Sequence, residues 1–355
     1  MYLKTTFSLA FVLLTCINVL SQTKSVDIDN FRFTFEYRNT PEKPVNPLFF
    51  TYSTKVIPTK TTEQRVSIDE INDNITVAGQ QKVDIEEDAD ITIVVELGNL
   101  TIGASKVSER RVENKDRNGK VTSVSRYYSL NVIYTFNGSY KIYRKNSIMH
   151  ESVVYSNGSP QTYTSPEYGS SKDASDYWRN NRDMLISEFT TTLSKQVAFH
   201  ASNYASVNYG FPVIKKTDVL QITDEKKHLE NETFRGMCSK LKIELESMTA
   251  ENGLIKENLT DIIKYFEQIP QKYTDVKRKA DIKLRYAAYY NLCKIYYYLD
   301  EPDNIAQYAD LLIANDYDKK DGERLKKDAE RLKAVLTRTK INTRHFDPYG
   351  EFEFE

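Results

Sequence analysis

The first half of the chain alternates apolar and polar positions, which is the pattern of β-strands that bury one face. Ile91, Ile93, Val95 and Leu97 form one such run, and further runs cover residues 31–37 and 128–136. Three Asn-Gly pairs, at 118–119, 137–138 and 157–158, are almost evenly spaced. Each pair predicts a hairpin turn, because Asn and Gly tolerate the positive φ that tight turns need. The pattern predicts an antiparallel meander.

A helix is expected to follow this sheet. Residues 165–175 are rich in Ser, Gly and Pro and read as a link, and helical spacing then runs over 176–204. We expect this helix to cover one face of the sheet, since a sheet needs such a layer for burial. Its apolar candidates are Trp178, Leu185, Phe189, Leu193, Val197 and Phe199. Earlier, residues 40–47 predict a loop, and residues 54–68 predict an exposed edge or a disordered stretch.

The last third of the chain changes to helical periodicity. Over 282–299 the apolar residues fall on two adjacent stripes, so this helix needs neighbours on two sides. Pro302 ends it and suits the first turn of a second helix, whose core stripe is Ile305, Ala309 and Leu312. A third helix over 321–336 has a charged outer face, as a terminal capping helix requires.

The first two of these helices resemble a tetratricopeptide repeat. Tyr289-x-x-Leu292-Cys293-x-x-Tyr296 matches the first-helix pattern of that family. The second helix departs from the pattern, with Ile305, Ala309 and Leu312 standing where the family prefers other residues, and Tyr317 standing in the position of its Pro. The resemblance implies a stack of helical hairpins that binds a protein or peptide. An ordinary α-helical bundle is the alternative.

Together these patterns predict an α+β chain: an N-terminal antiparallel β-sheet domain with a covering helix (22–210), then an α-helical tetratricopeptide-like hairpin stack (211–340). A tail (341–355) ends in the alternating sequence Glu-Phe-Glu-Phe-Glu. That alternation favours a strand that adds to a sheet edge, and a frayed acidic tail is the alternative.

The first residues read as an export signal. Lys4 precedes an apolar core, and acceptable cleavage residues place the cut after Ser21, ahead of Gln22. The chain is therefore expected to be periplasmic or secreted. Cys16 offers an alternative, a lipoprotein anchor, although the Thr before it is atypical. No later segment is apolar enough to span a bilayer.

Charge and chemistry narrow the function further. The net charge is −1, without a long basic run, which argues against nucleic acid as a partner. The sequence contains no nucleophile elbow, phosphate loop, dinucleotide fingerprint or metal-ligand spacing, so no catalytic residue, metal or cofactor is predicted. Cys238 and Cys293 lie on inward-facing helical positions, where two buried free thiols are the commoner case.

A non-catalytic, exported scaffold of the cell envelope is thus the leading interpretation. The candidate partner-binding residues are Tyr289, Tyr290, Tyr296 and Tyr297, on the first repeat helix. Two alternatives remain open. One is an envelope hydrolase that uses a carboxylate pair in the sheet domain. The other is a glycan- or lipid-binding sheet braced by the helices, which aromatic residues lining a cleft would favour.

Overall fold

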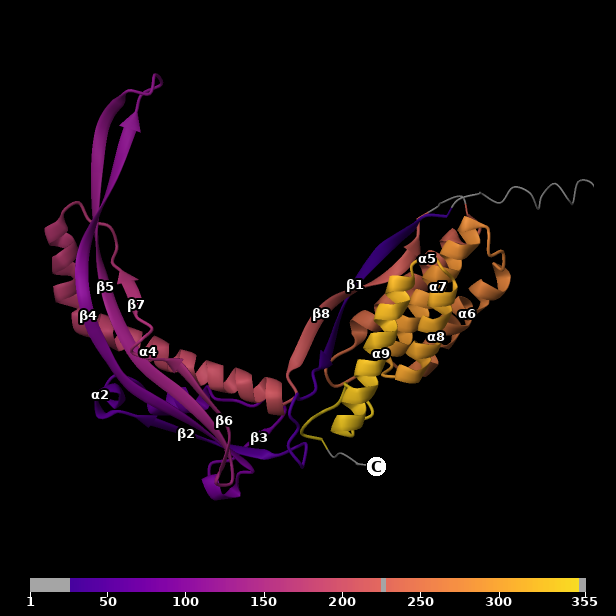
Figure 1. Cartoon of the computed structure of the whole chain (residues 1–355), viewed down its shortest axis with the longest axis horizontal. Coiled ribbons are helices and arrows are strands. Elements are labelled where there is room, and N and C mark those ends of the chain that lie inside the picture. Colours follow the sequence, from indigo (N-terminus) through magenta and orange to yellow (C-terminus); the bar gives the residue numbers. More distant parts are fainter. Residues whose placement is uncertain (1–25, 225–227, 351–355) are drawn as a thin grey trace, which may run out of the picture. The chain divides into compact units, whose positions relative to one another are not determined.

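A computed structural model describes residues 26–224 and 228–350, which form two compact units. We call residues 41–211 the sheet unit, and residues 26–40 with 212–350 the helical unit. The predicted α+β class is confirmed, with an N-terminal sheet and a C-terminal stack of helices (Figure 1). The predicted signal peptide, Cys16 and residues 351–355 lie outside the described residues. Among the residues described, no helix has an apolar stretch long enough to cross a bilayer.

The sheet unit is built on strands in the order β3-β2-β4-β5-β6, with β7 also paired to β5. As predicted, β4, β5, β6 and β7 pair in antiparallel fashion, whereas β2 runs parallel to β3 and β4. The strands are β2 (Thr51–Pro58), β3 (Gln81–Lys82), β4 (Ile91–Lys115), β5 (Val121–Arg144), β6 (Ser147–Tyr155) and β7 (Gln161–Thr164). Between β2 and β4 lie the short helices α2 (Lys60–Glu63) and α3 (Ile68–Asp73) and the 3-10 turn η1 (Glu86–Asp88). Residues 54–68 thus form ordered strand and helix.

One long helix, α4 (Ser171–Tyr209), covers the inner face of this sheet and extends beyond the predicted range at both ends. The Ser170 hydroxyl caps its start by accepting a hydrogen bond from the Asp173 N–H at 3.1 Å. Leu193, Val197 and Ala201 pack with the inward residues of β4 and β5, as expected for a covering helix. Phe199 is 65 % exposed. Its place in the predicted core was wrong, because it lies on the face of α4 opposite Val197 and Ala201.

The prediction of a turn at Asn137-Gly138 was also wrong, because β5 continues through both residues. A Cβ built on Gly138 would lie 2.4 Å from Cγ2 of Val197, so only glycine leaves room for α4 to pack this closely on β5. The chain instead reverses at Lys145, which has a φ of 54°. The other two Asn-Gly pairs do form turns, closed by the Gly119 N–H to the Asp116 carbonyl and the Ser159 N–H to the Ser156 carbonyl, each at 3.0 Å.

The helical unit begins with a two-stranded ribbon in which β1 (Ile28–Arg38) pairs in antiparallel fashion with β8 (Val213–Thr223). The sequence placed β1 in the sheet domain and did not predict β8. The reason for the difference is burial: Phe33 and Phe35 pack against Tyr298, with ring centroids 5.5 and 4.6 Å apart. The apolar face of β1 therefore belongs to the core of the helical unit.

In the described part of this unit, the ribbon is followed by the helices α5 (Asn231–Ser247), α6 (Thr260–Lys272), α7 (Lys279–Tyr298), α8 (Pro302–Ala314) and α9 (Lys319–Thr339). A 3-10 turn, η2 (Lys256–Leu259), precedes α6. The helices α7, α8 and α9 match the three that periodicity predicted, and consecutive members pack against each other. A Cβ on Gly322 would lie 2.6 Å from Cγ1 of Ile313, so this glycine permits the close contact of α9 with α8.

Residues 341–350, the described part of the tail, contain no strand, and the alternating Glu-Phe-Glu-Phe-Glu segment on which both tail predictions rest lies outside the described residues. The Arg38 N–H donates to the Arg344 carbonyl at 2.9 Å, and the Phe346 N–H donates to the Ala250 carbonyl at the same distance. Phe346 and Ile341 are buried. This segment is therefore a packed part of the helical unit.

Candidate partner-binding site

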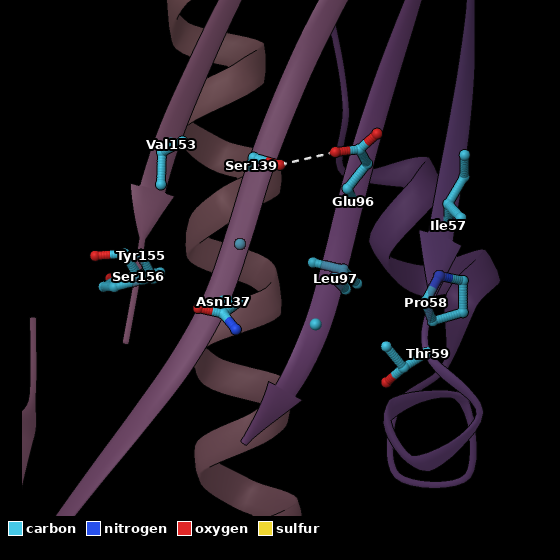
Figure 2. Close-up of a pocket in the computed structure, with 12 residues that line it drawn as sticks. Ile57, Pro58, Thr59, Glu96, Leu97, Asn137, Ser139, Val153, Tyr155 and Ser156 are labelled. Atoms are coloured by element: carbon cyan, nitrogen blue, oxygen red, sulfur yellow. Dashed lines mark hydrogen bonds between the residues drawn. The ribbon is translucent and has the colours of Figure 1, made fainter. Parts of the chain in front are cut away.

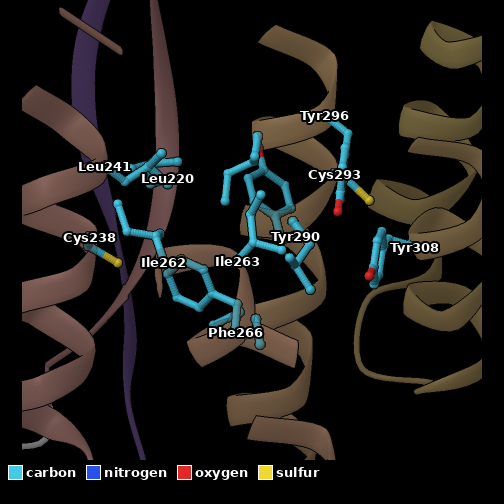
Figure 3. Close-up of a cluster of buried hydrophobic side chains, with 14 of the residues drawn as sticks. Leu220, Cys238, Leu241, Ile262, Ile263, Phe266, Tyr290, Cys293, Tyr296 and Tyr308 are labelled. Atoms are coloured by element: carbon cyan, nitrogen blue, oxygen red, sulfur yellow. The ribbon is translucent and has the colours of Figure 1, made fainter. Parts of the chain in front are cut away.

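Two of the four candidate tyrosines lie in the core of the helical unit. Tyr290 is 2 % exposed and Tyr296 is 7 % exposed. Figure 3 shows both among the side chains that fill the space between neighbouring helices. Tyr296 stacks on Tyr308 with ring centroids 5.4 Å apart and an interplanar angle of 7°. These two residues stabilise the stack and offer no ring face to a partner.

Tyr297 is half-buried and is already covered on one face. The Arg344 guanidinium lies 4.6 Å from the centroid of its ring, and the Tyr298 ring meets its edge at 5.2 Å. It also lines a groove of about 240 Å³ together with Asn39, Leu332 and other residues. Its principal contacts hold the C-terminal segment in place.

Tyr289 is the candidate that borders an open pocket with apolar surroundings. The pocket has a volume of about 410 Å³ and lies between the start of α7, the end of α8 and the loop before α7. Two of its apolar residues are unusually accessible: Val276 is 75 % exposed and Leu311 is 40 % exposed. The lining residues are Val276, Arg285, Tyr289, Leu311, Ala314, Asn315 and Asp316. Burial raises the pKa of Tyr289, so its hydroxyl is neutral at physiological pH.

The polar wall of this pocket is held rigidly. The Arg285 Nε donates to Oδ1 of Asn315 at 2.8 Å, and its Nη1 donates to the Tyr273 carbonyl at 2.6 Å. The Asn315 amide in turn donates to the Ile282 carbonyl at 2.8 Å. These bonds tie α7, α8 and the loop together. A partner side chain would therefore enter a preformed pocket, which reduces the entropy lost on binding.

A second surface, on the sheet unit, bears on the two alternative functions. A groove of about 460 Å³ is lined by residues of β2, β4, β5 and β6, and Figure 2 shows its side chains on the sheet face opposite α4. Its lining contains one carboxylate, Glu96, and one aromatic residue, Tyr155. Hydrogen bonding by Lys141, at 3.0 Å, lowers the pKa of Glu96 although burial opposes it. The groove lacks the second carboxylate that the hydrolase alternative needs. It also lacks the set of aromatic side chains that the glycan-binding alternative needs.

Lys294, a buried charge of the helical unit, has a structural partner in Asp218. Asp218 accepts hydrogen bonds from Lys294 at 2.6 Å and from the Tyr298 hydroxyl at 2.5 Å. Burial works to raise the pKa of Asp218, but Lys294 and Tyr298 together bring it below its ordinary value. This cluster joins β8 to α7.

Neither the two cysteines nor the residue types that bind metals form a reactive site in the described residues. Cys238 and Cys293 are free thiols, and burial raises the pKa of both, which makes them unreactive. Within residues 26–224 and 228–350, no group of three His, Cys, Asp or Glu side chains is placed to hold a metal ion.

Comparison with known proteins adds little. No family model and no curated protein matches the chain. Among solved structures, the rare lipoprotein B of Shewanella oneidensis is 12 % identical over 42 % of this chain and 94 % of its own, with a TM-score of 0.21. A homolog of the neuraminyllactose-binding hemagglutinin from Helicobacter pylori is 12 % identical over 46 % of this chain and 95 % of its own, with a TM-score of 0.20. Likenesses this weak carry no argument about function.

Of the residues that line the pocket, the sequence indicated only Tyr289, and it did not indicate the two accessible apolar residues, Val276 and Leu311. Leu311 lies in the apolar run Leu311-Leu312-Ile313, where periodicity does not single out one exposed member. Val276 stands in a loop between charged residues. Their shared feature, exposure next to Tyr289, arises only when α8 and the loop meet on α7.

Proposed function

We propose that this chain is an exported, non-catalytic scaffold that binds a protein partner through its helical unit. In this proposal α7 and α8 act as a tetratricopeptide-like hairpin, and the pocket beside Tyr289 receives an apolar side chain of the partner. The proposal rests on the export signal and helical pattern of the sequence, and on the pocket itself.

One observation carries the proposal: the accessible apolar pair Val276 and Leu311 flanks a pocket whose polar wall is fixed. Contiguous exposed apolar surface is a feature of interaction sites and of ligand-binding grooves. The four-residue candidate site thereby reduces to Tyr289 and its new neighbours. Tyr290 and Tyr296 serve the core.

Site-specific photo-crosslinking tests this function. A photoreactive phenylalanine would replace Leu311 in the full chain, expressed in its native cell. The matched control places it at Ile243 on α5, which is also apolar and is 67 % exposed. We expect a discrete crosslinked protein from position 311 that is missing from position 243. Identical products at both positions, or no product from a folded and exported chain, would overturn the proposal.

A further inference from the structure

The strands β4 and β5 extend past the rest of the sheet as a two-stranded hairpin arm, residues 106–127 (Figure 1). β6 pairs with β5 only from Gly138 onward, and β7 only over Asn131–Tyr134. The arm ends in a turn in which Gly119 has a φ of 80°. The backbone pairing of the arm is thus internal, and most of its side chains are exposed.

The arm concentrates positive charge. It carries seven basic and three acidic residues, a net charge of +4, whereas the whole chain has −1 and the remainder therefore −5. No other charged residue lies between Glu96 and Lys141. The basic residues are Lys106, Arg110, Arg111, Lys115, Arg117, Lys120 and Arg126.

The cations at the tip of the arm are not neutralised by neighbours. Ion pairs hold Arg110 to Glu167 at 2.6 Å, Arg111 to Glu113 at 3.3 Å and Arg126 to Glu109 at 3.6 Å. Across the described residues, no ion pair involves Lys115, Arg117 or Lys120, which surround the turn.

The acid at the turn is already engaged in backbone hydrogen bonds. The Asp116 carboxylate accepts from the N–H groups of Asn118 and Lys120, each at 2.9 Å. Asp116 keeps its negative charge, so the tip, residues 115–120, carries three cations and one anion, a net charge of +2.

β5 also carries exposed apolar side chains: Val121 stands opposite Lys115, Val124 opposite Glu113 and Tyr127 opposite Arg110. Val121 is 41 % exposed, Val124 is 40 % exposed and Tyr127 is 37 % exposed. A soluble ligand that offers only phosphate groups could bind the cations, but it would provide no apolar surface for the valine side chains. The interface of a bilayer accommodates both kinds of group, because anionic headgroups attract cations while the acyl boundary takes up apolar and tyrosine side chains.

We infer that the hairpin arm binds the surface of a bilayer that contains anionic lipids. Lys115, Arg117 and Lys120 contact lipid phosphates, and Val121 and Val124 enter the headgroup boundary. This site lies on the sheet unit and does not depend on the partner pocket of the helical unit. Binding weakens with salt, because the attraction acts between exposed charges.

Vesicle co-sedimentation of the full mature chain tests the inference. The probes are vesicles of phosphatidylcholine alone and of equal parts phosphatidylcholine and phosphatidylglycerol. The tip variant is K115Q/R117Q/K120Q. Its matched control, K240Q/K264Q/K327Q, removes three exposed lysines of the helical unit. A second variant, V121T/V124T, removes apolar surface without changing charge.

We expect binding to the anionic vesicles only. The tip variant should bind about a hundredfold more weakly, since each cation near such a surface strengthens binding about fivefold. The control variant should bind as the unmodified chain does, and the valine variant should fall between them. Equal binding of the tip and control variants would overturn the inference. Capture by soluble heparin or duplex DNA without capture by vesicles would also overturn it, in favour of a soluble polyanion.

Discussion

Arg344 and Asp300 form an ion pair that is almost wholly buried, with Nε and Oδ1 2.6 Å apart and side chains 6 % and 1 % exposed. The same guanidinium donates to the Tyr297 carbonyl at 2.7 Å and lies over the rings of Tyr37 and Tyr297. One side chain thus joins the C-terminal segment, the end of α7 and β1. Burial works to lower the pKa of Arg344, but Asp300 and Tyr297 together raise it above its ordinary value.

Breaking this pair should strongly destabilise the helical unit. We expect Arg344→Ala to lower the free energy of unfolding by about 3–5 kcal/mol, because it leaves the Asp300 carboxylate buried without its partner. Urea unfolding followed by circular dichroism measures the change. Lys326→Ala, which removes an exposed pair with Asp310, is the control and should cost less than about 1 kcal/mol. Equal effects of the two substitutions would contradict the role given to Arg344.

A side chain at position 138 should destabilise the sheet unit, because α4 packs directly on Gly138. Gly138→Ala should cost about 1–3 kcal/mol, because the new methyl group would overlap the rigid, β-branched Val197. The double variant with Val197→Ala should recover part of that loss. A double-mutant cycle on the free energy of unfolding measures the coupling. Additive effects would show that the two residues do not meet.

The stability of the helical unit should fall on mild acidification. Burial lowers the pKa of His345, whose Nδ1 donates to the Thr249 carbonyl at 2.6 Å while Nε2 is buried without a hydrogen-bond partner. A lowered histidine pKa means that the folded state favours the neutral ring. Its contribution is therefore complete above the unfolded pKa of about 6.5 and is lost as the pH falls below it.

His345→Gln should make the free energy of unfolding depend less on pH between about 7 and about 5, a window that lies above the ordinary carboxyl pKa values. Urea titrations at several pH values provide the measurement. Burial lowers the pKa of His228 as well, so His228→Gln should act in the same direction. A steeper pH dependence in either variant would have the wrong sign for this account.

The tyrosines of α7 should separate into two classes. Tyr290→Ala removes a fully packed ring and should cost about 3–5 kcal/mol, as large-to-small changes in a core do. Tyr289→Ala should cost clearly less, because that ring is only half-buried. Thermal unfolding of both variants provides the comparison. The reverse order would place Tyr289 in the core and remove it from the pocket.

Local sequence signals predicted α4, α7, α8 and α9 well, did not single out α5 or α6, and predicted the long-range pairings poorly. Periodicity located α7, α8 and α9 because their apolar stripes repeat within each helix. The pairing of Ile28 with Thr223 joins segments that are 195 positions apart in the sequence, and no local pattern reveals it. The Asn137-Gly138 pair predicted a turn but lies inside β5. Glycine is needed there because Val197 of α4 packs against it, and this contact cannot be read from the local sequence.

The candidate site was predicted only in part for a related reason. Helical spacing shows which face of α7 is apolar, but it does not show which neighbour covers each tyrosine. The ring of Tyr308 covers Tyr296, whereas Tyr289 is left at the rim where α8 ends. The exposed partners of Tyr289 come from other elements, so only the folded arrangement brings the pocket together.

The most direct test of partner binding at this pocket is the dissociation constant of the crosslinked partner, measured for the unmodified chain, Leu311→Asp and Ile243→Asp. A charge placed in an apolar pocket should weaken binding at least about tenfold, which corresponds to about 1.4 kcal/mol. The same change at Ile243, which is more exposed than Leu311 (67 % against 40 %), should leave the constant unaltered. Equal constants for all three folded proteins would contradict the proposed site.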